Sequence, residues 1–292
     1  MRWLGQRFRR AGQAGKPGKS RAVLLTITAV SVFGAVVVIP VGVGASGLAD
    51  RIVHRIGRAV LPQSAAASQN AQSFGGVAAV GALFMVRSGK LGQHFCTASV
   101  VDSPAGDLAV TAAHCVTGSI SVTGSSEKLV FIPGYDNGTE PYGAWQVTRV
   151  YTDAAWNASQ NPDDDFAFLK ISDASDGVPI EDVTGADQLG TASTARTLVR
   201  VVGYPDDAAK PVSCTNWAES YSPTQLQFDC GGYTDGTSGS PFLAGVSDTS
   251  DEGTVVGVIG GYEQGGDTPS VSYSVAFGST VTSLFQTAEA GG

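Results

Sequence analysis

Short runs of apolar and β-branched residues, separated by turn residues, dominate the chain from position 77 onward. Clusters of Gly, Asp, Asn and Pro separate these runs, a spacing typical of β-sandwiches and β-barrels. A helical pattern occurs only near the end, where residues 279–290 place Val281, Leu284 and Phe285 on one side. We therefore predict an all-β body with one C-terminal helix and strands over 77–86, 95–101, 108–112, 128–132, 145–151, 166–171, 197–202, 254–259 and 270–277.

Two segments without a strand pattern divide the chain. Residues 50–72 are rich in Ala, Ser and Gln, which predicts a linker or pro-segment. The acidic stretch 172–188 lies near the middle of the body, where it would join two halves. We predict one domain over 73–292, with a first half at about 73–175 and a second at about 190–285.

Charge separates the N-terminal region from the body. The chain has 18 Lys/Arg and 26 Asp/Glu, of which residues 1–60 hold ten Lys/Arg and one Asp, a net charge of +9. Residues 61–292 hold the remaining eight basic and 25 acidic residues, a net charge of −17. Nucleic-acid recognition needs a basic surface, so this body is not expected to bind nucleic acid.

The basic N-terminus precedes an apolar run over residues 22–39. This order predicts a secretory signal peptide within residues 1–49. The alternative is a retained membrane anchor, because the apolar run at 22–39 is just long enough to cross a bilayer. Both interpretations place the body outside the cytoplasm, either secreted or anchored to the outer face of the membrane, and only the second gives it a membrane partner.

The four cysteines all lie in the predicted exported body, at Cys96, Cys115, Cys214 and Cys230. An even number of cysteines in an oxidising compartment favours two disulfides, with three possible pairings. Zinc binding is disfavoured, because the chain has no CxxC pair and only three histidines. We predict no metal site and no cofactor.

Three short motifs carry the residue types of nucleophilic catalysis. They are TAAHC at 111–115, with His114; DFAFLKI at 165–171, with Asp165; and GTSGSP at 236–241, with Ser238. A serine hydroxyl becomes a strong nucleophile when a histidine accepts its proton, and a carboxylate holds that histidine in the required tautomer. Asp165 is preferred over its neighbours Asp163 and Asp164, because Asp165 directly precedes the apolar strand.

Each motif alone has a simpler structural explanation, as a packed histidine, a strand start or a glycine turn. Together and in this order, over about 73–285, they resemble the chymotrypsin-like serine proteases, and most closely the secreted bacterial type similar to glutamyl endopeptidases. The resemblance implies two six-stranded antiparallel β-barrels with a short C-terminal helix. It also implies a monomeric serine endopeptidase that acts on proteins or peptides.

Carried over to these positions, the resemblance implies that Ser238 attacks the peptide carbonyl and His114 transfers protons. Asp165 would orient His114, and the backbone N–H groups of Gly236 and Ser238 would form the oxyanion hole. The resemblance also implies a Cys96–Cys115 disulfide, which leaves Cys214–Cys230 as the second pair.

Two positions differ from the animal members of that family. Thr237 replaces an aspartate that pairs with a new N-terminus, so we expect an oxyanion hole formed without N-terminal insertion. Gly232 stands where trypsin-like enzymes carry a carboxylate, which argues against trypsin-like recognition of Lys or Arg. The resemblance places the substrate pocket at Gly232, Tyr233, Gly260, Gly261 and Tyr262.

Other function classes fit less well. The main alternative is an inactive relative that binds peptides or proteins through the same cleft. An α/β-hydrolase would need a Gly-x-Ser-x-Gly elbow and its histidine last in the chain, whereas His114 comes first. A structural cell-surface β protein would require all three motif matches to be accidental.

Overall fold

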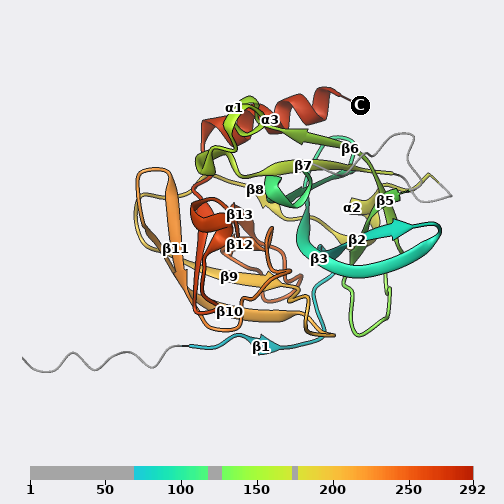
Figure 1. The fold of residues 1–292 in the computed structure, drawn as a ribbon, viewed down its shortest axis with the longest axis horizontal. Helices are drawn as coiled ribbons and strands as arrows, with labels where there is room; N and C mark the ends of the chain where they lie inside the picture. Colours follow the sequence, from blue (N-terminus) through green and yellow to red (C-terminus); the bar gives the residue numbers. More distant parts are fainter. Residues whose placement is uncertain (1–68, 118–126, 173–176, 292) are drawn as a thin grey trace, which may run out of the picture. The chain divides into compact units, whose positions relative to one another are not determined.

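The computed structural model describes residues 69–117, 127–172 and 177–291 (Figure 1). The predicted signal peptide or anchor, including residues 22–39, and most of the predicted pro-segment lie outside these residues. Within the described part of the chain, no helix combines the length and apolar character needed to cross a membrane.

The first half forms a closed barrel. Its six strands are connected in the order β2-β3-β4-β7-β6-β5, and all pairs are antiparallel. The strands are β2 (Val80–Arg87), β3 (Lys90–Val101), β4 (Leu108–Thr111), β5 (Glu127–Pro133), β6 (Trp145–Thr152) and β7 (Ala167–Ile171).

The second half is a curled sheet in the order β14-β11-β10-β9-β12-β13-β8. Its ends approach each other at an isolated bridge between Ile259 and Ser274, and the short β8 pairs with β13 in parallel. The strands are β8 (Gln188–Leu189), β9 (Thr197–Gly203), β10 (Val212–Ser220), β11 (Gln225–Asp229), β12 (Pro241–Ala244), β13 (Thr254–Val258) and β14 (Val271–Val275). The predicted all-β double-barrel fold is confirmed, with the second barrel curled rather than closed.

Three apolar clusters fill the interior. One lies within the first barrel, around Leu83, Phe131 and Leu169, and another within the second, around Phe228 and Phe242. The third joins the two halves and includes Val80, Phe166, Phe168, Tyr204 and Phe277 from both of them. Because this shared cluster is buried, the loops that cross the junction have a fixed position relative to both barrels.

The C-terminal helix α3 (Ser279–Ala290) has the predicted bounds and buries Val281, Leu284 and Ala288. It lies beside β6 and β7 of the first barrel (Figure 1). Two short helices were not predicted, α1 (Ala154–Ser159) and α2 (Ile180–Thr184).

A short N-terminal strand, β1 (Gln72–Ser73), pairs with β10 and runs along it in Figure 1. Just before it, the Ala71 N–H donates to the Gly231 carbonyl at 2.8 Å, and the Gly231 N–H donates to the Gln69 carbonyl at 2.7 Å. Residues 69–73 are therefore part of the second sheet.

Candidate active site

His114 lies at the end of the first barrel, in the 3-10 turn η1 (Ala113–Cys115) that follows β4. The adjacent Cys115 forms a disulfide with Cys96 of β3. The side chain of His114 is 16% exposed, so the ring is packed on one side and reaches a cleft on the other. The strand end and the disulfide together fix the backbone from which the imidazole projects.

Asp165 fixes the orientation of the His114 imidazole. Its carboxylate accepts hydrogen bonds from His114 Nδ1 at 2.7 Å, from the His114 backbone N–H at 2.9 Å and from the Gly261 N–H at 2.9 Å. The side chain is fully buried, and a buried carboxylate is stable only when such donors satisfy its oxygens. Because an ionised carboxylate only accepts, Nδ1 carries the proton and Nε2 is left as the basic nitrogen facing the cleft.

The neighbouring acidic residues have other partners. Asp163 accepts from the Gln225 amide at 2.8 Å, and Asp164 accepts from the Asn161 amide at 2.6 Å. Burial raises the pKa of Asp164 above its ordinary value, an effect opposed by the hydrogen bond from Asn161. Of the three consecutive aspartates, Asp165 is the one that contacts His114.

Gly260 allows the close approach of the second barrel to this carboxylate. A Cβ atom at Gly260 would lie 3.0 Å from Asp165 Oδ2 and 3.1 Å from the Asp165 carbonyl oxygen. A larger residue at this position would therefore push the 260–261 backbone away and weaken the hydrogen bond from Gly261.

Ser238 lies in the loop between β11 and β12, and it lines one cleft together with His114. The cleft has a volume of about 560 Å³, and its wall also includes Phe95, Asp235, Glu263 and Asp267. Among the described residues no hydrogen bond joins the Ser238 hydroxyl to the His114 ring. Such bonds are often long in the absence of substrate and shorten when the complex forms.

The backbone N–H groups of Gly236 and Ser238 point away from the interior of the loop between β11 and β12. The Asp235 carbonyl accepts from the Asp206 N–H at 2.8 Å, and the Thr237 carbonyl accepts from Ser240 Oγ at 2.6 Å. In a trans peptide the N–H is opposite to the carbonyl, so the N–H groups of Gly236 and Ser238 point the other way. Within the described part of the chain neither N–H donates a hydrogen bond, which is the arrangement that an oxyanion hole needs.

Gly236 has the backbone conformation that this loop requires. Its φ is +90°, and a Cβ atom there would lie 2.5 Å from the Asp206 nitrogen and 2.6 Å from the Tyr204 carbonyl oxygen. Only glycine fits this combination of positive φ and close backbone contact.

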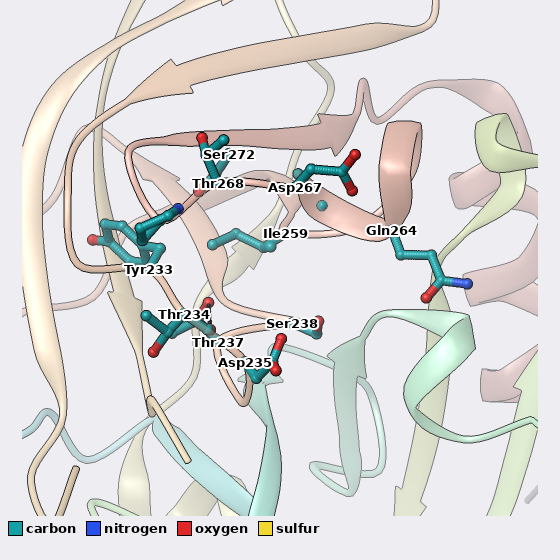
Figure 2. Close-up of a pocket in the computed structure, with 13 residues that line it drawn as sticks. Tyr233, Thr234, Asp235, Thr237, Ser238, Ile259, Gln264, Asp267, Thr268 and Ser272 are labelled. Carbon is teal, nitrogen blue, oxygen red and sulfur yellow. Dashed lines mark hydrogen bonds between the residues drawn. The ribbon is translucent and has the colours of Figure 1, made fainter. Parts of the chain in front are cut away.

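A second cavity of about 260 Å³ opens beside Ser238 (Figure 2). In the view of Figure 2, Ser238 and Asp235 lie on one side of it, Thr268 and Ser272 on the other, and Ile259 between them. Of the five predicted pocket residues, Tyr233 lines this cavity, and its hydroxyl donates to the Val201 carbonyl at 2.8 Å. Burial raises the pKa of Tyr233, so this phenol stays neutral.

The other four predicted pocket residues lie outside the lining of this cavity. Gly232 is exposed, Gly260 and Gly261 contact Asp165, and Tyr262 packs against Tyr221 with ring centroids 5.0 Å apart. About half of the lining comes from a glycine-rich loop after β13, which was not predicted from the sequence; its contributing residues are Gln264, Gly265, Gly266, Asp267, Thr268 and Pro269. The adjacent glycines at 265 and 266 were the available signal for a loop of this kind.

Both disulfides named from the sequence are present, Cys96–Cys115 and Cys214–Cys230. The Sγ atoms of Cys96 and Cys115 and a ring nitrogen of His114 lie within 4.8 Å of one another, a spacing that would suit a metal ion. Because the two sulfurs are bonded to each other, they are not thiolate ligands.

Comparison with known proteins agrees with this architecture. A sequence model of the trypsin-like peptidase domain matches residues 96–279, more than half of the chain. No curated protein matches the sequence.

Three solved structures have the same fold. Protease Anisep from Arthrobacter nicotinovorans is 25% identical with a TM-score of 0.62, and the match covers 75% of this chain and 99% of Anisep. The thermostable serine protease AL20 from an extremophilic microorganism is 23% identical with a TM-score of 0.61, covering 74% of this chain and 98% of AL20. A Glu endopeptidase is 17% identical with a TM-score of 0.57, covering 76% of this chain and 97% of that enzyme. The chain belongs to the trypsin-like peptidase family and is a serine endopeptidase.

Proposed function

We propose that this chain cleaves peptide bonds through an acyl-enzyme intermediate, with Ser238 as nucleophile, His114 as general base and acid, and Asp165 as the group that orients His114. The observation that carries this proposal is the fixed His114–Asp165 pair facing the same cleft as Ser238. The two free N–H groups of the serine loop support the same assignment.

In the first step, the Ser238 hydroxyl transfers its proton to His114 Nε2 while Oγ bonds to the carbonyl carbon of the substrate. The electron pair of the carbonyl π bond moves to its oxygen, where the N–H groups of Gly236 and Ser238 donate to the new negative charge. The tetrahedral species then loses its amine: the C–N bond breaks, and the proton on Nε2 passes to the leaving nitrogen.

In the second step, water replaces the amine. His114 accepts a proton from the water, and the resulting hydroxide oxygen bonds to the acyl carbon. Collapse of the second tetrahedral species breaks the bond to Ser238 Oγ, which regains its proton from His114. Asp165 stays ionised throughout and stabilises the imidazolium that forms twice in each cycle.

We also propose that the enzyme works outside the cytoplasm. Two formed disulfides favour an oxidising compartment, and the basic and then apolar order of residues 1–49 is that of an export segment. N-terminal sequencing of protein from the culture medium and the membrane fraction tests this, since a retained anchor would keep residues 22–39 on the membrane-bound form.

Replacement of the nucleophile tests the catalytic assignment. Ser238→Ala should lower kcat on a peptide substrate by about 10⁵ or more, because the acyl-enzyme cannot form. Ser270→Ala removes an exposed hydroxyl outside the cavity lining and should leave kcat unchanged. A fluorophosphonate should label the wild type at Ser238 and fail to label Ser238→Ala.

Two outcomes would reject the proposal. Hydrolysis by Ser238→Ala at more than about one per cent of the wild-type rate would mean that another group is the nucleophile. Failure of the folded wild type to react with the fluorophosphonate, combined with peptide binding in the cleft, would instead favour the inactive binding module.

A further inference from the structure

Thr97 is a buried hydroxyl that bonds to the serine loop from the opposite barrel. It lies in β3, directly after Cys96, and its side chain is fully buried. We propose that Thr97 is a positioning residue that holds the oxyanion hole in its active geometry; this proposal rests on the function proposed above.

Three hydrogen bonds connect Thr97 to the second barrel. Its Oγ1 donates to the Gly236 carbonyl at 3.1 Å and accepts from the Tyr204 N–H at 3.0 Å. Its backbone N–H donates to the Ser238 carbonyl at 2.8 Å. One residue of the first barrel therefore contacts both residues whose N–H groups are proposed to bind the oxyanion.

The Gly236–Thr237 peptide lies between the two peptides that carry the free N–H groups. Its orientation therefore sets the distance and angle between those groups. The N–H of this middle peptide already donates to the Thr234 carbonyl at 3.1 Å. In the described part of the chain, the Thr97 hydroxyl is the only donor to its carbonyl.

Hydrogen bonds hold the 236–238 backbone, and no ion pair contributes to it among the described residues. Thr237 is buried, and its hydroxyl donates to the Thr234 carbonyl at 2.7 Å. Without an aspartate at this position, no charge–charge attraction is available to hold the 236–238 backbone. The Thr97 hydroxyl supplies an anchor on the other side of the loop, from a strand that the Cys96–Cys115 disulfide also ties to His114.

The replacement Thr97→Val tests this role, because it keeps the shape of the side chain and removes the hydroxyl. We expect kcat to fall about 10- to 100-fold with KM changed less than about threefold, since loss of a whole oxyanion donor costs about 10²–10³ in kcat. Thr97→Ser keeps the hydroxyl and should recover kcat to within about threefold of the wild type. Ser99→Ala, a buried hydroxyl two residues further along β3 that bonds to Asp187, is the matched control and should keep the wild-type kcat.

A pair of inhibitors separates positioning from general loss of structure. A peptidyl trifluoromethyl ketone forms a hemiketal with Ser238 and places an oxyanion in the hole, whereas the corresponding alcohol cannot. For Thr97→Val, the ketone should bind about 10- to 100-fold more weakly, in parallel with kcat/KM, while affinity for the alcohol stays within about threefold.

Several outcomes would overturn the proposal. One is a folded Thr97→Val enzyme with kcat within about twofold of the wild type, and another is equal weakening of ketone and alcohol. If Thr97→Val does not fold, Thr97→Ala, which leaves room for a water, takes its place. Unfolding of both variants would mean that the hydroxyl serves the fold as a whole, which also rejects a specific role in the loop. An active wild type labelled at Ser238 would show that such failures concern Thr97 alone and leave the proposed mechanism intact.

Discussion

The two halves of the candidate site are held in place by different forces. His114 and Asp165 belong to the first barrel, where a disulfide and hydrogen bonds to a buried carboxylate fix them. The Ser238 loop belongs to the second barrel and is held by hydrogen bonds, two of them from Thr97 of the first barrel. The acid–base pair thus comes from one barrel, although Asp165 also accepts a hydrogen bond from the Gly261 N–H of the second, whereas the serine loop is bonded across the junction through Thr97.

This difference predicts that damage to the histidine half changes proton transfer, while damage to the serine half changes stabilisation of the oxyanion. Both lower kcat, but they differ in pH dependence and in affinity for a hemiketal-forming inhibitor. Substitutions in each half, with a control of the same residue type nearby, separate the two.

Apart from loss of the nucleophile itself, the largest effect is expected from Asp165→Asn. An amide can donate to Nδ1 and so stabilise the wrong tautomer, in which Nε2 carries the proton and cannot accept one from Ser238. We expect kcat at neutral pH to fall by about 10⁴, the magnitude known for this replacement in a Ser-His-Asp triad. Asp164→Asn, at the adjacent carboxylate that bonds to Asn161, should keep kcat within about threefold. Steady-state kinetics on both variants would contradict the assignment if the two lost activity equally.

A smaller effect is expected in the serine half from Gly236→Ala. The new Cβ would meet the Asp206 nitrogen and the Tyr204 carbonyl oxygen and displace the loop, so kcat should fall about 10²- to 10³-fold. Gly138→Ala is the matched control, because Gly138 has a φ of +83° but a Cβ added there would have no neighbouring atom within 4 Å. The Gly138→Ala variant therefore has an alanine at positive φ, as Gly236→Ala does, but its Cβ contacts no neighbouring atom.

Kinetics and inhibitor binding distinguish these two glycine variants. Gly236→Ala should weaken the trifluoromethyl ketone in parallel with kcat/KM, while Gly138→Ala should lower only the free energy of unfolding, by about 1 kcal/mol. Equal losses of kcat in both variants would mean that strain alone, rather than displacement of the Gly236 N–H, accounts for the effect.

The same contrast explains what the sequence could predict. His114, Asp165 and Ser238 each lie in a compact motif whose residue types follow from the chemistry, and most strands follow from apolar alternation. Strands β10, β11 and β12 were not among those predicted. For β10 the reason is that only Cys214 and Ala218 of its nine residues are buried, so its pattern is mostly polar. Thr97 gave no signal, because its role arises only where strands far apart in the sequence meet.

Four of the five residues predicted for the substrate pocket do not line the cavity beside Ser238, and their assignment to the pocket stays a prediction. Residues 260–262 were predicted to line the substrate pocket from the resemblance alone. In the structure Gly260 lies against Asp165, and the Gly261 N–H donates a hydrogen bond to it. The loop over 264–269 lines the cavity beside Ser238. Its position depends on backbone contacts such as the hydrogen bonds from the Gly232 and Tyr233 N–H groups to the Pro269 carbonyl, at 2.8 and 3.2 Å.

The junction of the two barrels also contains a buried carboxylate, Asp187, which lines neither of the two cavities beside Ser238. Asp187 is 1% exposed and accepts hydrogen bonds from the Ser99 hydroxyl of the first barrel and from the Gly253 N–H of the second, the latter at 2.8 Å. Burial raises its pKa from 3.8 to about 6, with a further contribution from the charge of Glu252, while the two hydrogen bonds oppose the shift.

The last prediction follows from this shift and concerns stability rather than kcat. Well below its ordinary pKa of 3.8, the Asp187 carboxyl is protonated in both the folded and unfolded states and carries no penalty. As the pH rises from about 4 through 6, the unfolded state releases its proton first, so the folded state is progressively destabilised, by about 3 kcal/mol in total.

Asp187→Asn removes this dependence, so the free energy of unfolding of the variant minus that of the wild type should increase by up to this amount between about pH 4 and pH 7. Urea unfolding over this range measures it, and Asp248→Asn, at an exposed carboxylate of the second barrel, should keep the wild-type slope. A constant difference between Asp187→Asn and the wild type across this range would show that the junction of the two barrels does not titrate through Asp187.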